Sequence, residues 1–142
     1  MAQERDALAL LHASVQRAFS TVTKVPLKYS RPLAGAPYRL TFAAPRAACG
    51  NGIFVVWWHY FVLSGGLPRP TGYLYAVEDQ NGVEILSYHW HPASPPDTPH
   101  LHLGHGSGVR RAELLSGAHL PTGAVDWPQF LEVVRLFAPG SG

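Results

Sequence analysis

The sequence contains a single cysteine, Cys49, among its 142 residues. One cysteine cannot form an internal disulfide or a zinc knuckle of several thiolates, so any metal ligands must be mainly histidine or carboxylate. Charged residues are also scarce, at 14% against roughly 25% in an average globular protein. Because the hydrophobic content is 46%, this scarcity of charge excludes disorder driven by charge repulsion.

Long apolar runs are absent as well. The longest run, over residues 53–63, is interrupted by His59 and is too short to cross a bilayer as a helix. The first residues include acidic side chains and lack the basic and apolar regions of a secretory signal. A net charge of +2 with neutral histidines is too small to indicate a nucleic-acid or membrane partner by itself. We therefore expect a cytoplasmic protein with no membrane partner.

The length and the patterning of the chain predict one α+β domain over residues 1–142. Apolar residues recur at spacings of three and four near the amino terminus, which predicts an amphipathic helix over about residues 2–22. From about residue 25 to 104, β-rich segments are separated by proline and glycine, which predicts an antiparallel meander of about six strands. A second apolar stripe predicts a C-terminal helix over about residues 127–137.

Two local signals support this order of elements. Asp126 and Gln129 have the spacing of a capping box, in which each side chain bonds the backbone N–H of the other residue. Asn81-Gly82 lies between two of the expected strands and is typical of a type I′ hairpin turn. The sequence thus predicts where the last helix begins and where one hairpin turns.

Histidine is in clear excess, with 8 copies against 2 lysines. In the strand expected to end near residue 91, side-chain alternation places His89 and His91 on one face, and His100 and His102 share a face of the next strand. If the two strands pair antiparallel with their apolar faces together, His91 lies near His100 and His89 lies near His102. The sequence therefore predicts a square of four imidazoles.

Such a square suits two chemistries. Zinc, or another divalent transition metal, accepts three or four histidine nitrogens, and a catalytic zinc keeps one position for water. Alternatively, two imidazoles act without metal as general base and general acid, because both protonation states exist near neutral pH. We take His89, His91, His100 and His102 as candidate catalytic and metal-ligating residues. A solvated polar face on an edge hairpin is the alternative without a function.

Four further residues are candidates for binding a substrate. Arg110 and Arg111 follow a loop with glycines at alternate positions, whose backbone amides could cradle a phosphate oxygen. His105 lies within that loop, and His119 precedes the C-terminal helix. Acidic residues are nearly absent from this part of the chain. The expected substrate therefore contains phosphate, as RNA or as a small molecule.

The most apolar segment also contains a histidine and several aromatic residues. His59 lies between Trp58 and Tyr60, where packing in the core is the expected role. If the strands follow chain order, His59 could instead reach the inner edge of the histidine cluster. Trp57 and Trp58 point to opposite faces of this strand, so helices on both sides, or a dimer partner, are expected to cover it.

Residues 73–137 resemble the TumE-type toxins of bacterial toxin-antitoxin pairs. The likeness lies in a short meander that ends in a histidine-rich strand and precedes a C-terminal helix, as in Tyr88-His89-Trp90-His91, Pro99-His100-Leu101-His102 and residues 126–137. The resemblance implies a toxin that acts on RNA and pairs with a helix-turn-helix antitoxin. It also implies that the four histidines of the predicted square are the functional residues.

Two functions therefore remain open. The first is a small hydrolase that acts on a phosphate-containing substrate, such as a toxin-like ribonuclease. The second is a non-catalytic module, in which the cluster binds metal for stability or the aromatic strand binds a protein partner. That partner would be an antitoxin or a second copy of the chain. The sequence does not determine whether the protein is an enzyme.

Overall fold

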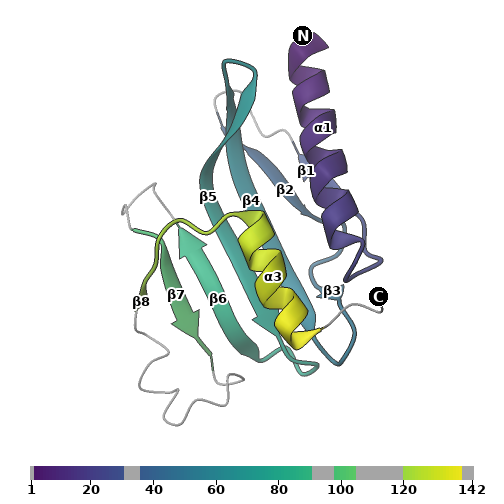
Figure 1. Ribbon diagram of the computed structural model, residues 1–142, viewed down its shortest axis with the longest axis vertical. Coiled ribbons are helices and arrows are strands. Elements are labelled where there is room, and N and C mark those ends of the chain that lie inside the picture. Colours follow the sequence, from purple (N-terminus) through teal and green to yellow (C-terminus); the bar gives the residue numbers. More distant parts are fainter. Residues whose placement is uncertain (1, 31–35, 91–97, 105–119, 139–142) are drawn as a thin grey trace.

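The computed structural model describes residues 2–30, 36–90, 98–104 and 120–138. A long helix is followed by an antiparallel sheet and a shorter helix (Figure 1). The elements are α1 (Ala2–Phe19), β1 (Leu27–Ser30), β2 (Tyr38–Phe42), β3 (Ala47–Ala48), β4 (Phe54–Ser64), β5 (Leu67–Glu78), β6 (Glu84–Trp90), β7 (His100–Leu103), β8 (Leu120–Pro121) and α3 (Trp127–Phe137). None of the helices in these ranges is long and apolar enough to cross a membrane.

The sheet is a meander in which every described pair of neighbouring strands is antiparallel. Its order is β1-β2-β4-β5-β6-β7-β8, and β3 pairs with β4 beside this path. The predicted α+β architecture is confirmed, and all six expected strands are present. The additional strands, β3 and β8, have two residues each. Strands of this length are too short to show an alternation of apolar and polar residues in the sequence.

The two helices end or begin where side chains satisfy their terminal backbone groups. The N-terminal helix ends at Phe19 rather than near residue 22, because the hydroxyls of Ser20 and Thr21 donate to carbonyl oxygens of the last turn, each at 2.7 Å. The C-terminal helix has the predicted bounds. Asp126 accepts from the Gln129 N–H at 2.9 Å, and the Gln129 side chain accepts from the Asp126 N–H at 3.0 Å.

The β4–β5 hairpin is longer than predicted. The β-rich pattern of the sequence begins only at Gly72, whereas β5 begins at Leu67, because Gly65 and Gly66 form a tight turn with φ of 60° and 78°. Pro68 and Pro70 conceal this part of the strand in the sequence, since proline cannot donate to a sheet ladder. The ladder is irregular near Pro70, where the register shifts between Tyr60 and Phe61 of β4.

The β5–β6 turn forms at the predicted place but with a different geometry. The Asp79 carboxylate accepts the backbone N–H groups of Asn81 and Val83, at 2.9 and 3.0 Å. Gly82 has a φ of 78°, whereas Asn81 is not among the residues with positive φ. The predicted type I′ turn, which needs positive φ at both positions, is therefore wrong. The aspartate side chain favours the observed turn by satisfying two amides.

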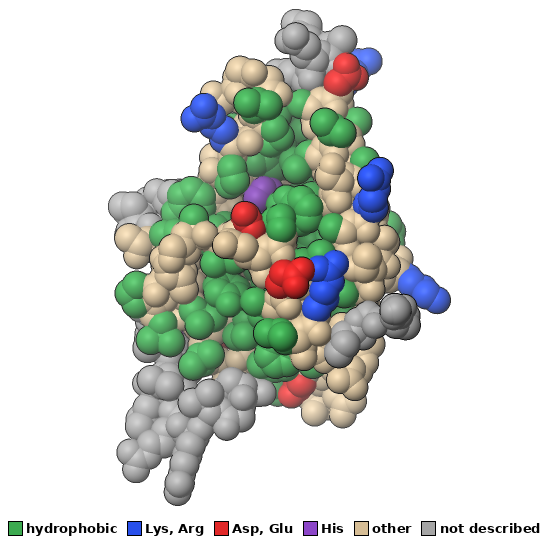
Figure 2. All heavy atoms as spheres, in the orientation of Figure 1, with side chains coloured by type: hydrophobic (Ala, Val, Ile, Leu, Met, Phe, Trp, Pro, Cys, Tyr) green, Lys and Arg blue, Asp and Glu red, His purple; other side chains and the backbone are tan. Residues whose placement is uncertain are grey.

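Among the described elements, α1 and α3 cover one face of the sheet, which we call the helix face (Figure 1). Its fully buried side chains include Val15, Phe19, Val55, Trp57, Phe61, Tyr75, Val77, Phe130 and Val134. In the space-filling view, hydrophobic side chains crowd the surface around α3 with few charged groups among them (Figure 2). The helix face therefore contains the core, and the candidate site must be sought elsewhere.

Gly104 allows a close approach between β7 and the start of β6. Its N–H donates to the Ile85 carbonyl at 3.0 Å, and an added Cβ would lie 2.1 Å from the Glu84 carbonyl oxygen.

We expect Gly104→Ala to lower the free energy of unfolding by about 1–3 kcal/mol, because backbone must move to admit the methyl group. Urea denaturation measures this loss. Gly123→Ala is the control, since nothing lies within 4 Å of the position that its methyl group would take; equal losses in both variants would contradict the steric argument.

Candidate metal centre

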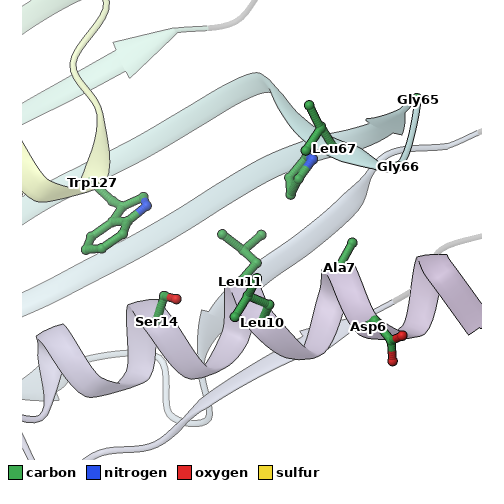
Figure 3. Close-up of a pocket in the computed structure, with 10 residues that line it drawn as sticks. Asp6, Ala7, Leu10, Leu11, Ser14, Gly65, Gly66, Leu67 and Trp127 are labelled. Atoms are coloured by element: carbon green, nitrogen blue, oxygen red, sulfur yellow. The ribbon is translucent and has the colours of Figure 1, made fainter.

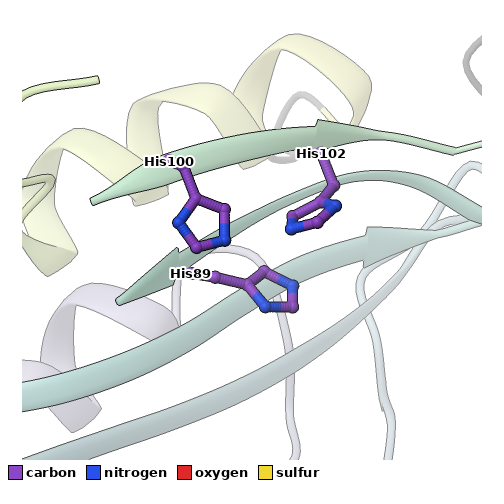
Figure 4. A group of neighbouring side chains, drawn as sticks. All are labelled: His89, His100 and His102. Atoms are coloured by element: carbon purple, nitrogen blue, oxygen red, sulfur yellow. The ribbon is translucent and has the colours of Figure 1, made fainter. Parts of the chain in front are cut away.

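The opposite face of the sheet, which we call the histidine face, carries three histidines on two neighbouring strands. In the antiparallel pair β6–β7, His89 lies opposite His100 and Ser87 lies opposite His102. Directly paired residues point to the same face of a sheet, and so do residues two apart in one strand. The side chains of His89, His100 and His102 consequently meet on this face (Figure 4).

The predicted pairing register is wrong by two residues. The sequence placed His91 opposite His100, whereas the structure pairs His89 with His100. The apolar faces match in either register. In the predicted register Trp90 would pair with a leucine of β7, and in the observed register Leu86 pairs with one instead. A shift of two residues keeps every side chain on its face, so the convergence of the histidines survives the error.

The three rings are close enough to share one ion. Their centroids are 5.5 Å apart for His89 and His100, 4.5 Å for His89 and His102, and 4.8 Å for His100 and His102. One nitrogen from each ring lies within 4.8 Å of the other two. A tetrahedral zinc with bonds of about 2.1 Å needs nitrogens about 3.4 Å apart, so modest ring rotations would complete the site.

Neighbouring groups orient two of the three rings. His100 Nδ1 lies 2.7 Å from the Thr98 carbonyl oxygen. A carbonyl only accepts, so Nδ1 carries a proton and the neutral ring has its lone pair on Nε2. His89 Nε2 lies 2.8 Å from the Ser87 hydroxyl, which can either donate or accept. Such outer contacts fix the ring orientation of metal-binding histidines.

Burial distinguishes the three histidines. His100 is 3% exposed, and Ser87 beside the cluster is fully buried. His89 and His102 are half-buried, so part of each residue is exposed to solvent. The alternative expectation of a fully solvated polar face is therefore wrong for His100. Burying an imidazole costs free energy unless it is hydrogen-bonded, and the Thr98 carbonyl provides that bond.

The remaining predicted site residues lie outside the described part of the chain. These are His91, His105, Arg110, Arg111 and His119. Their assigned roles, as a fourth histidine of the square and as substrate-binding groups, remain predictions. Of the four histidines in the predicted square, the structure brings three together.

Sequence reasoning missed the groups that orient the rings. Ser87 has a signal that could have identified it, because it stands two residues before His89 and so shares its face. Thr98 contributes through its backbone carbonyl, which any residue type would offer. No residue pattern could therefore have indicated the Thr98 contact.

His59 packs in the core, as expected. It is 4% exposed, its Nδ1 lies 2.6 Å from the Tyr75 hydroxyl, and its ring stacks on Trp57 with a centroid distance of 5.4 Å. Burial lowers the pKa of His59 to about 4. The suggestion that it could reach the histidine cluster is wrong, because His59 lies on the helix face. Its strand neighbour Trp58, not His59, is in line with His89.

A cleft lies away from the histidines, between α1 and the β4–β5 hairpin (Figure 3). Its volume is about 600 Å³, and its apolar lining residues include Leu10, Leu11, Leu67 and Trp127. Asp6 is the only ionisable side chain among its lining residues. The cleft therefore lacks the converging polar groups that catalysis or metal binding requires.

These features define an α+β protein with a three-histidine cluster that could hold a metal ion. Comparisons with protein-family models, with curated proteins and with solved structures find no match for the chain. Any assignment of function must therefore come from the site itself.

Proposed function

We propose that the protein hydrolyses a phosphate-containing substrate, and that His89, His100 and His102 would hold the zinc, or similar divalent transition metal, that this reaction needs. The convergence of three ring nitrogens within 4.8 Å carries this proposal. Imidazole nitrogen is a preferred zinc ligand, and the buried Cys49 is too remote in the fold to add a thiolate, since it belongs to the core on the helix face.

The number of ligands found among the described residues favours catalysis. Structural zinc sites normally have four protein ligands, whereas catalytic sites have three and leave a position for water. A zinc ion held by these residues would supply Lewis-acid activation of water near neutral pH. His89 and His102 are half-buried rather than buried, as a site that admits a substrate requires.

The charge of such a site favours an anionic substrate. Three neutral imidazoles would leave the two positive charges of the metal uncompensated, because the cluster contains no carboxylate from the described part of the chain. Strands β1, β2, β4 and β7 contain no acidic residue. A phosphate oxygen would therefore be attracted to the metal and polarised by it.

A second function is favoured by the position of the cluster between two strands. β7 has four residues and pairs on its far side with the two-residue β8, so a metal bridging β6 and β7 would stabilise this side of the sheet. Under this alternative the metal raises the melting temperature but supports no turnover.

Metal analysis and a hydrolysis assay test the proposal. Protein purified without a polyhistidine tag is expected to bind one zinc ion per chain. With zinc it should hydrolyse bis(p-nitrophenyl) phosphate, and it should lose this activity when a chelator removes the metal. One bound zinc that raises the melting temperature without turnover would favour the structural alternative. Absence of metal binding would sink both.

His91→Ala separates an open site from a closed one. If three histidines hold the metal, this variant keeps the zinc affinity of the parent protein. A large loss of affinity would indicate a fourth histidine ligand and a closed, structural site.

The resemblance to TumE-type toxins adds a narrower proposal, that the substrate is RNA and that the partner is an antitoxin.

A further inference from the structure

A row of paired residues connects the histidine cluster with an exposed tryptophan. Each residue in the row lies directly opposite the next one on the neighbouring strand, from β1 to β7. The row consists of Lys28, Thr41, Trp58, Leu74, His89 and His100. Neighbouring strands are about 4.8 Å apart, so the row spans roughly 24 Å of the histidine face.

Trp58 is the large exposed ring of this row. It is 39% exposed, whereas the adjacent Trp57, on the helix face, is 1% exposed. The guanidinium carbon of Arg39 lies 5.4 Å from the centroid of the Trp58 ring. The core does not account for a tryptophan in this position. A flat aromatic ring beside a cation provides a surface on which another planar ring can stack.

Three basic side chains share this face with Trp58. Lys28 and Arg69 are exposed, and Arg39 is half-buried. A hollow of about 220 Å³ is lined by Lys28, Arg39 and Trp58. A second hollow, of about 330 Å³, is lined by Arg39 and Tyr60. Lys28 and Arg39 therefore line the first hollow, and Arg39 also lines the second.

Few acidic groups oppose these cations. The carboxylate of Glu78, at the end of β5, is paired with Arg46 at 2.6 Å. No ion pair joins Lys28, Arg39 or Arg69 to an acid within the described ranges. The histidine face is thus complementary in charge to a polyanion and offers an aromatic ring as well.

We propose that the histidine face binds single-stranded nucleic acid, with a base stacked on Trp58 and phosphates held by Arg39 and Lys28. A duplex offers phosphates but keeps its bases stacked inside, so the single strand is the form that can use the tryptophan. The proposal deepens the proposed function, on which it rests for cleavage. The bound strand would lead along the row through Leu74 to the metal centre.

Fluorescence anisotropy with a labelled 12-nucleotide single strand tests this inference, using chelator-treated protein so that no cleavage occurs. Trp58→Ala is expected to weaken binding about tenfold, and Trp58→Phe to restore most of the loss, because base stacking needs a ring. Arg39→Ala should also weaken binding and should lower the slope of log affinity against log salt by about 0.7.

Arg5→Ala is the matched control, because it removes the same charge from the exposed surface of α1. This variant is expected to bind as the parent does. Equal weakening by Arg5→Ala, no binding by the parent protein, or polyphosphate binding that matches the oligonucleotide and ignores Trp58→Ala would each overturn the inference. Thermal melting of every variant verifies that the fold is intact.

The same assay separates this inference from the metal proposal. Trp58→Ala should weaken oligonucleotide binding yet keep the zinc affinity of the parent protein, since Trp58 lies three strands away from His100. If only zinc binding fails, the metal proposal is wrong and the nucleic-acid inference is retained. If only oligonucleotide binding fails, the nucleic-acid inference is wrong and the metal centre acts on a different substrate.

Discussion

His100→Ala is expected to weaken zinc binding by a factor on the order of a hundred or more, while the protein remains folded. The ring is one of three converging ligands, and its Nδ1 bond to Thr98 directs Nε2 as the metal-binding nitrogen. Zinc sites contribute roughly 10–16 kcal/mol through four ligands, so each ligand accounts for several kcal/mol. Competition with a chromophoric chelator measures the affinity.

His12→Ala is the matched control for this experiment. His12 lies on α1, where its Nε2 is 2.9 Å from the Leu27 carbonyl oxygen, and it is not part of the cluster. Its replacement removes one imidazole and should leave the zinc affinity unchanged. If the two variants bind zinc equally well, the three-histidine site is not the binding site. If His100→Ala also melts at a much lower temperature without metal, loss of fold explains its effect.

Acidification from pH 6.5 to 4 is expected to cost about 3 kcal/mol of folding free energy through His59 alone. Burial lowers the pKa of His59 from 6.5 to about 4 in the folded state. Between these values the unfolded chain binds a proton that the folded protein excludes, so stability falls as the pH falls. A difference of about 2.5 pKa units corresponds to about 3 kcal/mol.

Urea denaturation of the parent protein and of His59→Phe at pH 7.5 and pH 4 isolates this contribution. The phenyl ring keeps the stacking on Trp57 but cannot titrate. The variant should be less stable at pH 7.5, because the Tyr75 hydroxyl loses its partner at 2.6 Å. Its stability should then decrease less on acidification than that of the parent. Parallel pH dependences would show that His59 is not the titrating group.

The sequence predicted the local parts of the fold because local physics decides them. The capping box of Asp126 and Gln129 needs only residues three apart, and it forms as expected. The alternation that places His100 and His102 on one face is likewise a property of any strand. The predicted type of the β5–β6 turn was wrong, although it is also a local feature. The Asp79 carboxylate accepts two backbone N–H groups, and the Asn-Gly pattern does not include this contribution.

Non-local pairing was beyond the reach of the sequence. Two registers of β6 against β7 give equally apolar contacts, so the pattern of leucines could not choose between them. Which strand faces lie under the helices was also undecided, and the sequence therefore left His59 as a possible neighbour of the cluster. The structure separates them onto opposite faces, since His59 pairs with Tyr73 and His89 with Leu74.

The sequence by itself determined an α+β meander with histidines concentrated on one strand face, because periodicity and composition depend only on neighbours along the chain. Only the tertiary structure decided that three of these histidines share one site and that Trp58 stands in line with them. The physical reason is that hydrogen-bonded register between strands sets which residues from distant parts of the chain lie side by side. Periodicity along a strand determines the face to which a side chain points, and register determines which residue of the next strand lies beside it.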